Sequence, residues 1–138
     1  MTADELAARV VVVAGERPEL ASVVAAGVAA GASIAIVSRT LGDDLDGDVR
    51  FRADPTDLAV WDRVAMHVEQ HLGPVDGVVT DAEAVDVVTA TFATDLARRG
   101  HGAVVVAGPG EPAEQALRRS LGTRRAAPAP PRPGAAGR

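Results

Sequence analysis

The chain contains no cysteine and no tyrosine, and all 14 of its basic residues are arginine. Without cysteine it can form no disulfide and offers no thiolate nucleophile or metal ligand. The absence of tyrosine and lysine removes two side chains that often transfer protons in enzymes. Aromatic residues are limited to Phe51, Trp61 and Phe92. Alanine and valine must therefore fill the core through many small contacts.

Long apolar runs are also missing. Gly or polar residues interrupt every apolar stretch well before the length of a membrane span. The N-terminus carries Asp4 and Glu5, where a secretory signal would be basic. We therefore expect a cytoplasmic protein with no membrane span. A length of 138 residues, 47% of them hydrophobic, predicts a single domain with one core.

Charge is unevenly distributed. All 19 acidic residues precede residue 118, and the charged residues after that point are all arginine. From Gly122 onward the chain is rich in Pro, Ala and Gly, so we expect a domain over residues 1–121 and a disordered tail over residues 122–138. A basic tail can bind nucleic acid or an anionic membrane surface, but no aromatic side chain is present there to stack on bases. A solubilising tail is the favoured interpretation, and an accessory role on nucleic acid or membranes is an alternative.

Strand and helix patterns alternate along the chain. The continuous apolar run Val10–Ala14 predicts a strand that is buried on both faces. Further strands are predicted at residues 34–37, Val49–Arg52, residues 75–80 and residues 103–107. Helical spacing of apolar residues follows the first, third and fourth of these strands, and residues 111–121 can form a last short helix. Gly31 stands where a helix would end, and Asp57 stands where a helix would be capped.

This alternation predicts an α/β fold, a Rossmann-like, doubly wound parallel sheet of about five strands in a single α/β/α domain. Right-handed crossovers allow the strand order 3-2-1-4-5 or the flavodoxin-like order 2-1-3-4-5. Ligands on such sheets bind beyond the carboxyl ends of the strands. Candidate site positions are therefore residues 14–19, 38–40, 53–55, 80–83 and 107–110.

Three blocks in the same order resemble the short-chain dehydrogenase/reductase family. The sequence VVVAGERPELASVVAAGVAAGASIAIVSRT is similar to the family's first strand, glycine loop, helix and second strand. ADPTD at residues 53–57 and GPVDGVV at residues 73–79 are similar to its third and fourth strand regions. LARRGHGAVVVAG, at residues 96–108, is similar to the stretch that enters its fifth strand. The resemblance covers roughly residues 8–110 and implies the same fold, in the order 3-2-1-4-5.

The motifs that carry the family's chemistry are largely absent. Where the family has TGxxxGxG, only Gly15 remains, and Glu16 and Glu19 stand where a pyrophosphate would bind. Such acids repel an anion, although they also suit the start of a helix. The family's NNAG motif corresponds here to residues 80–83, Thr-Asp-Ala-Glu. The catalytic Tyr and Lys that the resemblance implies have no counterpart, so we assign no catalytic residue.

Three positions are candidate cofactor-binding residues by the resemblance, namely Gly15, Arg39 and Asp54. Arg39 corresponds to a place where a basic residue often meets a ribose 2′-phosphate, and Asp54 to an acid that often contacts adenine. Arg39 can equally be a surface charge, and Asp54 a turn former before Pro55. NAD or NADP is thus a possible cofactor, but we expect none.

Other candidate sites are weaker. His67 and His71 have the i, i+4 spacing of a metal-binding pair, but no third ligand is evident, so we assign no metal site. Asp43, Asp44, Asp46 and Asp48 form an acidic turn that does not match a calcium loop. A phosphorylated receiver with Asp54 as acceptor would need an acid pair after the first strand and a lysine, and both are missing.

We therefore expect a truncated, degenerate short-chain dehydrogenase-like protein that is non-catalytic and acts by binding a partner. The expected partner is a chain of the same type, in a homo- or hetero-oligomer. An alternative is an NAD(P)-dependent oxidoreductase whose missing groups come from a partner chain. Whether the protein is an enzyme stays open at this point, and nucleic acid is an unlikely partner.

Overall fold

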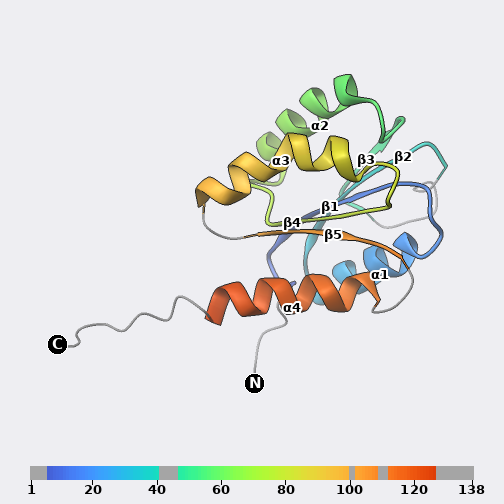
Figure 1. The fold of residues 1–138 in the computed structure, drawn as a ribbon. Helices are drawn as coiled ribbons and strands as arrows, with labels where there is room; N and C mark the ends of the chain where they lie inside the picture. Colours follow the sequence, from blue (N-terminus) through green and yellow to red (C-terminus); the bar gives the residue numbers. More distant parts are fainter. Residues whose placement is uncertain (1–5, 41–46, 100–101, 109–111, 127–138) are drawn as a thin grey trace.

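The computed structural model describes residues 6–40, 47–99, 102–108 and 112–126. Strands and helices alternate through most of this part of the chain (Figure 1). In chain order the elements are β1 (Val10–Ala14), α1 (Leu20–Ala30), β2 (Ser33–Ser38), β3 (Val49–Arg52), α2 (Leu58–His71), β4 (Gly77–Thr80), α3 (Val85–Arg99), β5 (Ala103–Val106) and α4 (Ala113–Ala126).

The five strands form one parallel sheet in the order β3-β2-β1-β4-β5. This confirms the predicted order 3-2-1-4-5 and excludes the flavodoxin-like alternative. β1 lies at the centre, where Val12 pairs with Ala35 on one side and with Val78 on the other. Every residue of β1 is buried, as its continuous apolar run predicts for a strand covered on both faces.

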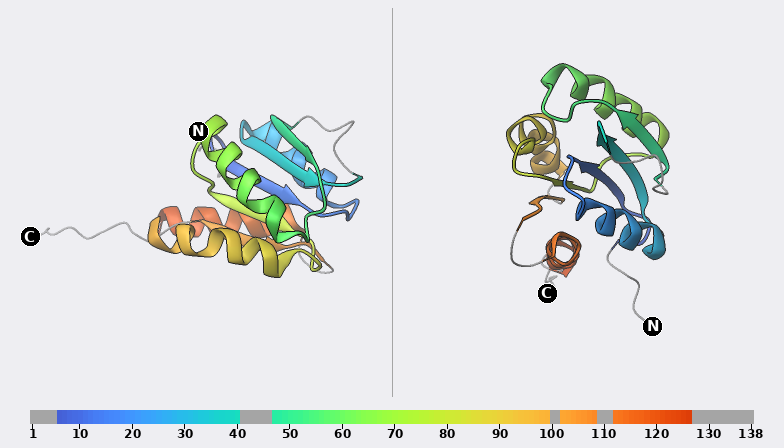
Figure 2. Two further views of the ribbon diagram at one scale, coloured as in Figure 1. Left: turned by 90° about the horizontal axis from the view of Figure 1, so that it is seen from above. Right: turned by 90° about the vertical axis from the view of Figure 1, so that its right-hand side faces the viewer.

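Helices cover both faces of the sheet (Figure 2). Helices α1 and α4 lie on one face, and helices α2 and α3 lie on the other (Figure 1). Each face therefore has its own core. The core under α1 and α4 is aliphatic and includes Leu20, Ile34, Ile36 and Leu117. The core under α2 and α3 contains Trp61 and Phe92.

Local signals set the helix boundaries. Gly31 ends α1 with φ 88°, a left-handed conformation that glycine adopts without strain, as its position in the sequence predicts. Asp57 caps α2, and its side chain accepts a hydrogen bond from the Ala59 amide at 3.0 Å. Helix α2 then buries Trp61, Val64 and Val68, three residues of the predicted apolar stripe.

Helix α4 is longer than the sequence suggests. It runs to Ala126, beyond the end expected at residue 121, so the first residues of the expected tail continue the helix. Glycine lowers the stability of a helix, so Gly122 favours a helix end in the sequence. The cost is modest, and α4 continues through this position in the structure. Residues 127–138 lie outside the described residues. None of the helices in the described part of the chain combines the length and the apolar character that a membrane span requires.

Candidate functional site

The carboxyl ends of β1, β2 and β4 meet at one edge of the sheet, where ligands of this fold class bind. The loop after β1 begins with Gly15 and Glu16, the loop after β2 contains Arg39 and Thr40, and Asp81 follows β4. Because β1 lies between β2 and β4, the loop after β1 contacts both neighbouring loops. This edge is the candidate functional site.

The carboxylate of Glu16 is bound by the loop that follows β2. It accepts hydrogen bonds from the Ser38 hydroxyl at 2.7 Å, the Arg39 amide at 2.7 Å and the Thr40 amide at 3.0 Å. The Thr40 hydroxyl donates a further bond at 2.5 Å. The Arg39 guanidinium lies 3.6 Å from the same carboxylate. These donors surround Glu16 in the way that a loop surrounds a bound oxyanion.

This environment stabilises the ionised form of Glu16. Partial burial alone would raise its pKa. The hydrogen bonds from Thr40, Arg39 and Ser38 outweigh burial and lower the pKa from 4.5 to about 2. Glu16 is therefore a carboxylate throughout the physiological pH range, and the loop after β1 carries a permanent negative charge that faces the donors of the loop after β2.

Asp81 fills the space on the other side of the loop after β1. Its side chain accepts hydrogen bonds from the Glu16 amide at 2.9 Å and from the Ala84 amide at 3.2 Å, and the residue is only 2% exposed. Gly15 permits this approach, since a Cβ there would lie 2.3 Å from an Asp81 oxygen and the backbone has φ 137°. The one remaining glycine of the loop thus makes room for a carboxylate of the protein itself.

The first turn of α1 offers few donors to a ligand. The amides of Leu20, Ala21 and Ser22 donate to the carbonyls three residues earlier, at 3.0, 3.0 and 3.1 Å. Glu19 forms an ion pair with Arg17 across the same turn. The N-terminus of a helix binds anions through free amides, and these three are already engaged.

The predicted cofactor residues lie at this edge but make other contacts. Gly15 faces Asp81, and the side chain of Arg39, 63% exposed, lies beside Glu16. Asp54 accepts hydrogen bonds from the hydroxyl of Thr56 at 2.7 Å and from its amide at 2.9 Å. These two bonds lower the pKa of Asp54. Asp54 thus has the geometry of the turn former that the sequence also allowed. Cofactor binding by the three residues stays a prediction.

The residues weighed as metal ligands are held by other interactions. The rings of His67 and His71 stack at 3.9 Å, and the His71 Nδ1 lies 2.9 Å from the His67 carbonyl oxygen. Asp48 accepts a hydrogen bond from the Ile34 amide at 2.8 Å and so joins the start of β3 to β2. Asp43, Asp44 and Asp46 lie outside the described residues. Within the described ranges, no group of three or more His, Asp or Glu side chains is placed to hold a metal ion.

Sequence reasoning missed two roles at this edge. It gave no hydrogen-bonding role to Glu16 or to Asp81, whereas both carboxylates accept hydrogen bonds from backbone amides. One signal was available. An acid after β1 can contact three successive donor residues at the end of β2 and just beyond it if these strands are neighbours, and the predicted order placed the two strands side by side.

The residues present fit a nicotinamide dinucleotide poorly. Its phosphates would need donors from the loops after β1 and β2 and from the start of α1. The Glu16 carboxylate already accepts hydrogen bonds from the loop after β2, and the Asp81 carboxylate accepts one from the loop after β1. The negative charge of Glu16 would also repel the phosphates of the ligand. At this site, two carboxylates of the protein, those of Glu16 and Asp81, accept the hydrogen bonds that the loop amides could otherwise donate to a ligand.

Comparison with known proteins reveals similarity in structure only. No family model matches the chain, and no curated protein matches it in sequence. A short-chain dehydrogenase from Streptomyces avermitilis superposes with a TM-score of 0.60 and 22% identity, over 82% of this chain and 56% of that one. The ligand-free aldohexose dehydrogenase of Thermoplasma acidophilum superposes with a TM-score of 0.65 and 10% identity, over 87% of this chain and 60% of that one.

These two structures establish the fold. The described chain has the architecture of short-chain dehydrogenases, as the three sequence blocks implied. It spans less than two thirds of the length of either neighbour.

Proposed function

We propose that this chain, whose fold is that of the short-chain dehydrogenases, is a non-catalytic protein that binds no nicotinamide cofactor and acts through contacts with another chain. The observation that carries the proposal is the carboxylate of Glu16 among the donors of Ser38, Arg39 and Thr40. A phosphate group could reach those donors only by displacing Glu16. Displacement would leave two anions close together in a partly desolvated place, which is unfavourable.

Two further features support the proposal. Asp81 holds the Glu16 amide, and the first amides of α1 bond to their own turn, so the pyrophosphate region also has few free donors. The resemblance to short-chain dehydrogenases implies a catalytic Tyr and Lys, and the sequence contains neither. Proton transfer by that pair is therefore impossible in this chain alone.

Calorimetric titration with NADH and NADPH tests the proposal. The unaltered protein should give no binding heat with either cofactor up to millimolar concentration. Glu16→Ala removes the carboxylate, frees the amides of Arg39 and Thr40, and should gain weak binding of NADPH. Glu83→Gln is the matched control, because it removes one negative charge from the exposed part of the loop after β4 without touching these donors. That variant should stay silent.

The outcomes separate the proposed function from its main alternative. Micromolar binding of either cofactor to the unaltered protein would overturn the proposal. It would favour an NAD(P)-dependent oxidoreductase whose missing groups come from a partner chain. Equal gains in Glu16→Ala and Glu83→Gln would indicate a general charge effect and would remove the assigned role of Glu16.

The outermost strand, β5, which has a neighbouring strand on one side only, supports the choice of a protein partner. β5 consists of Ala103–Val106, has no charged side chain, and leaves Val106 47% exposed. The opposite edge strand, β3, carries Arg50 and Arg52. Edge strands without charge pair readily with another strand, whereas charged edges resist pairing. A second chain of the same fold, adding a strand beside β5, is the partner that we propose.

A further inference from the structure

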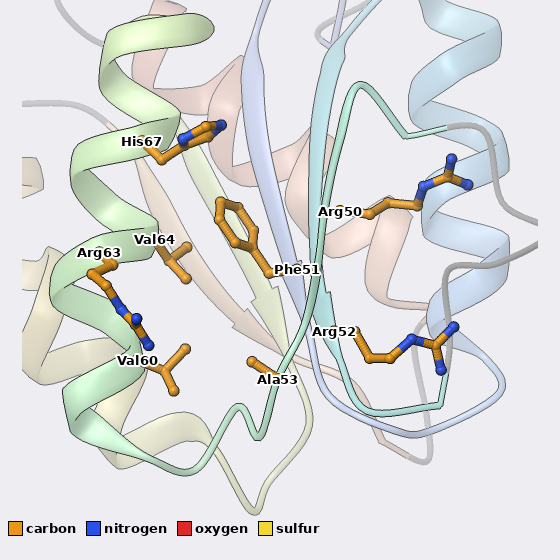
Figure 3. Close-up of a pocket in the computed structure, with 8 residues that line it drawn as sticks. All are labelled: Arg50, Phe51, Arg52, Ala53, Val60, Arg63, Val64 and His67. Carbon is orange, nitrogen blue, oxygen red and sulfur yellow. The ribbon is translucent and has the colours of Figure 1, made fainter.

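A groove separates the edge strand β3 from helix α2 (Figure 3). Its volume is about 490 Å³, within the range of cavities that hold small molecules. We call it the β3–α2 groove. The residues that line it are Arg50, Phe51, Arg52, Ala53, Val60, Arg63, Val64 and His67. It lies along the side of the sheet. None of its lining residues belongs to the Glu16 cluster, by which we mean Glu16 and its donors Ser38, Arg39 and Thr40.

The alternation of side chains along β3 makes the β3 wall of the groove apolar. Phe51 points toward α2, whereas Arg50 and Arg52 point to the opposite side of the strand (Figure 3). From the helix, Val60 and Val64 face the strand (Figure 3). The groove therefore has the ring of Phe51 on one wall and Val60 on the other, with the buried Val64, 1% exposed, behind them.

Arg63 and His67 of α2 also line the groove. The guanidinium of Arg63 lies beside Val60 on the α2 wall of the groove (Figure 3). No hydrogen bond or ion pair joins it to another described residue. The ring of His67 contacts Phe51 edge-on at 5.3 Å and stacks on His71 at 3.9 Å. His67 thus closes one end, while Arg63 supplies a solvent-exposed cation beside an apolar surface.

We propose that the β3–α2 groove binds a small carboxylic acid with an aromatic or branched hydrocarbon body. The body would lie between Phe51 and Val60, where its burial is favourable. The carboxylate would bind the fork of Arg63, whose donors match a carboxylate in geometry and charge. Arg63 is exposed, so its guanidinium is hydrated in the absence of a ligand. A carboxylate gains a charge-assisted pair with it that a neutral ligand of the same shape cannot form, and this favours the acid modestly.

Two-dimensional amide NMR of the whole protein tests this site, with phenylacetate and 4-methylpentanoate as separate probes. At least one probe should shift the amide signals of Phe51, Val64 and His67 in a saturable way. The amides of Arg39 and Thr40 should stay unchanged, because they belong to the Glu16 cluster. 2-Phenylethanol, which has the body of phenylacetate without its charge, should bind about two- to fivefold more weakly.

Variants of Arg63 make the test specific. Arg63→Gln should weaken binding of the acid by about two- to fivefold, and Arg63→Lys, which keeps the charge but not the fork, should weaken binding less. Arg98→Gln is the control, since Arg98 is an exposed arginine on α3 that pairs with Asp95. It should leave binding unchanged. Binding that ignores the Arg63 substitutions, shifts confined to other surfaces, or no saturable shift with either probe would overturn the proposal.

Discussion

At the scale of single residues, Glu16 joins two loops that are 22 positions apart in the sequence. A carboxylate can accept several hydrogen bonds at once, and each donor here is a backbone amide or a short hydroxyl side chain. Such bonds are stronger than those between neutral groups because the acceptor is charged. Glu16 therefore contributes to the stability of the fold.

Glu16→Gln should destabilise the protein at pH 7 by about 1–2 kcal/mol after allowance for solvent screening. The amide keeps the shape, but its NH₂ group meets backbone donors that it cannot accept from. The folded pKa of Glu16, about 2, lies below its ordinary value of 4.5. Its contribution is thus fully present above pH 4.5 and is lost as the pH falls toward 2. The difference between the two proteins in urea unfolding should shrink over that interval.

Glu83→Gln, an exposed acid of the same charge, should show no such interval. Equal stability of Glu16→Gln and the unaltered protein at pH 7, or a difference that stays constant down to pH 2, would contradict the role given to Glu16.

At the scale of elements, Trp61 anchors helix α2. The side chain is fully buried, and its indole Nε1–H donates to the Pro55 carbonyl at 2.8 Å. Its ring meets Phe92 of α3 edge-on, with 5.7 Å between centroids. One side chain therefore links the turn before α2, the core of that face and the neighbouring helix.

Trp61→Phe should destabilise the protein by roughly 2–3 kcal/mol, because it leaves a buried carbonyl without a donor and opens a cavity. Denaturation followed by circular dichroism measures the change, since the substitution removes the only tryptophan. Met66→Leu, at a position on the same helix that is 56% exposed, should change stability by less than about 0.5 kcal/mol. A comparably small loss in Trp61→Phe would show that the indole hydrogen bond and the packing contribute little.

At the scale of the whole molecule, the uncharged edge at β5 predicts association. Light scattering at increasing concentration should show a mass above that of one chain, and Val106→Lys should weaken the association by about tenfold or more, because it puts a charge on the pairing edge. Val28→Lys makes the same change on helix α1, at a position that is 39% exposed, and should have no effect. A single-chain mass at every concentration, or equal effects of the two variants, would contradict pairing of two copies through β5.

Much of the fold follows from local patterns, because buried parallel strands must be continuously apolar and their helices must carry one apolar stripe. Val10–Ala14 and Val49–Arg52 have the predicted bounds. β4 begins at Gly77 and not at residue 75, since the strand starts where pairing with β1 begins. The site was harder to predict. Whether Glu16 repels a ligand or binds the neighbouring loop depends on distances between strands, which no local pattern contains.

The division of the core has a spectroscopic consequence. Trp61 and Phe92 belong to the core under α2 and α3, and Phe51 packs against that same core. The core under α1 and α4 contains no aromatic side chain among the described residues. Tryptophan fluorescence and near-ultraviolet circular dichroism therefore report on one face of the sheet alone. Helix α4 could detach from the other face without any change in either signal, and only far-ultraviolet circular dichroism or amide hydrogen exchange would detect its loss.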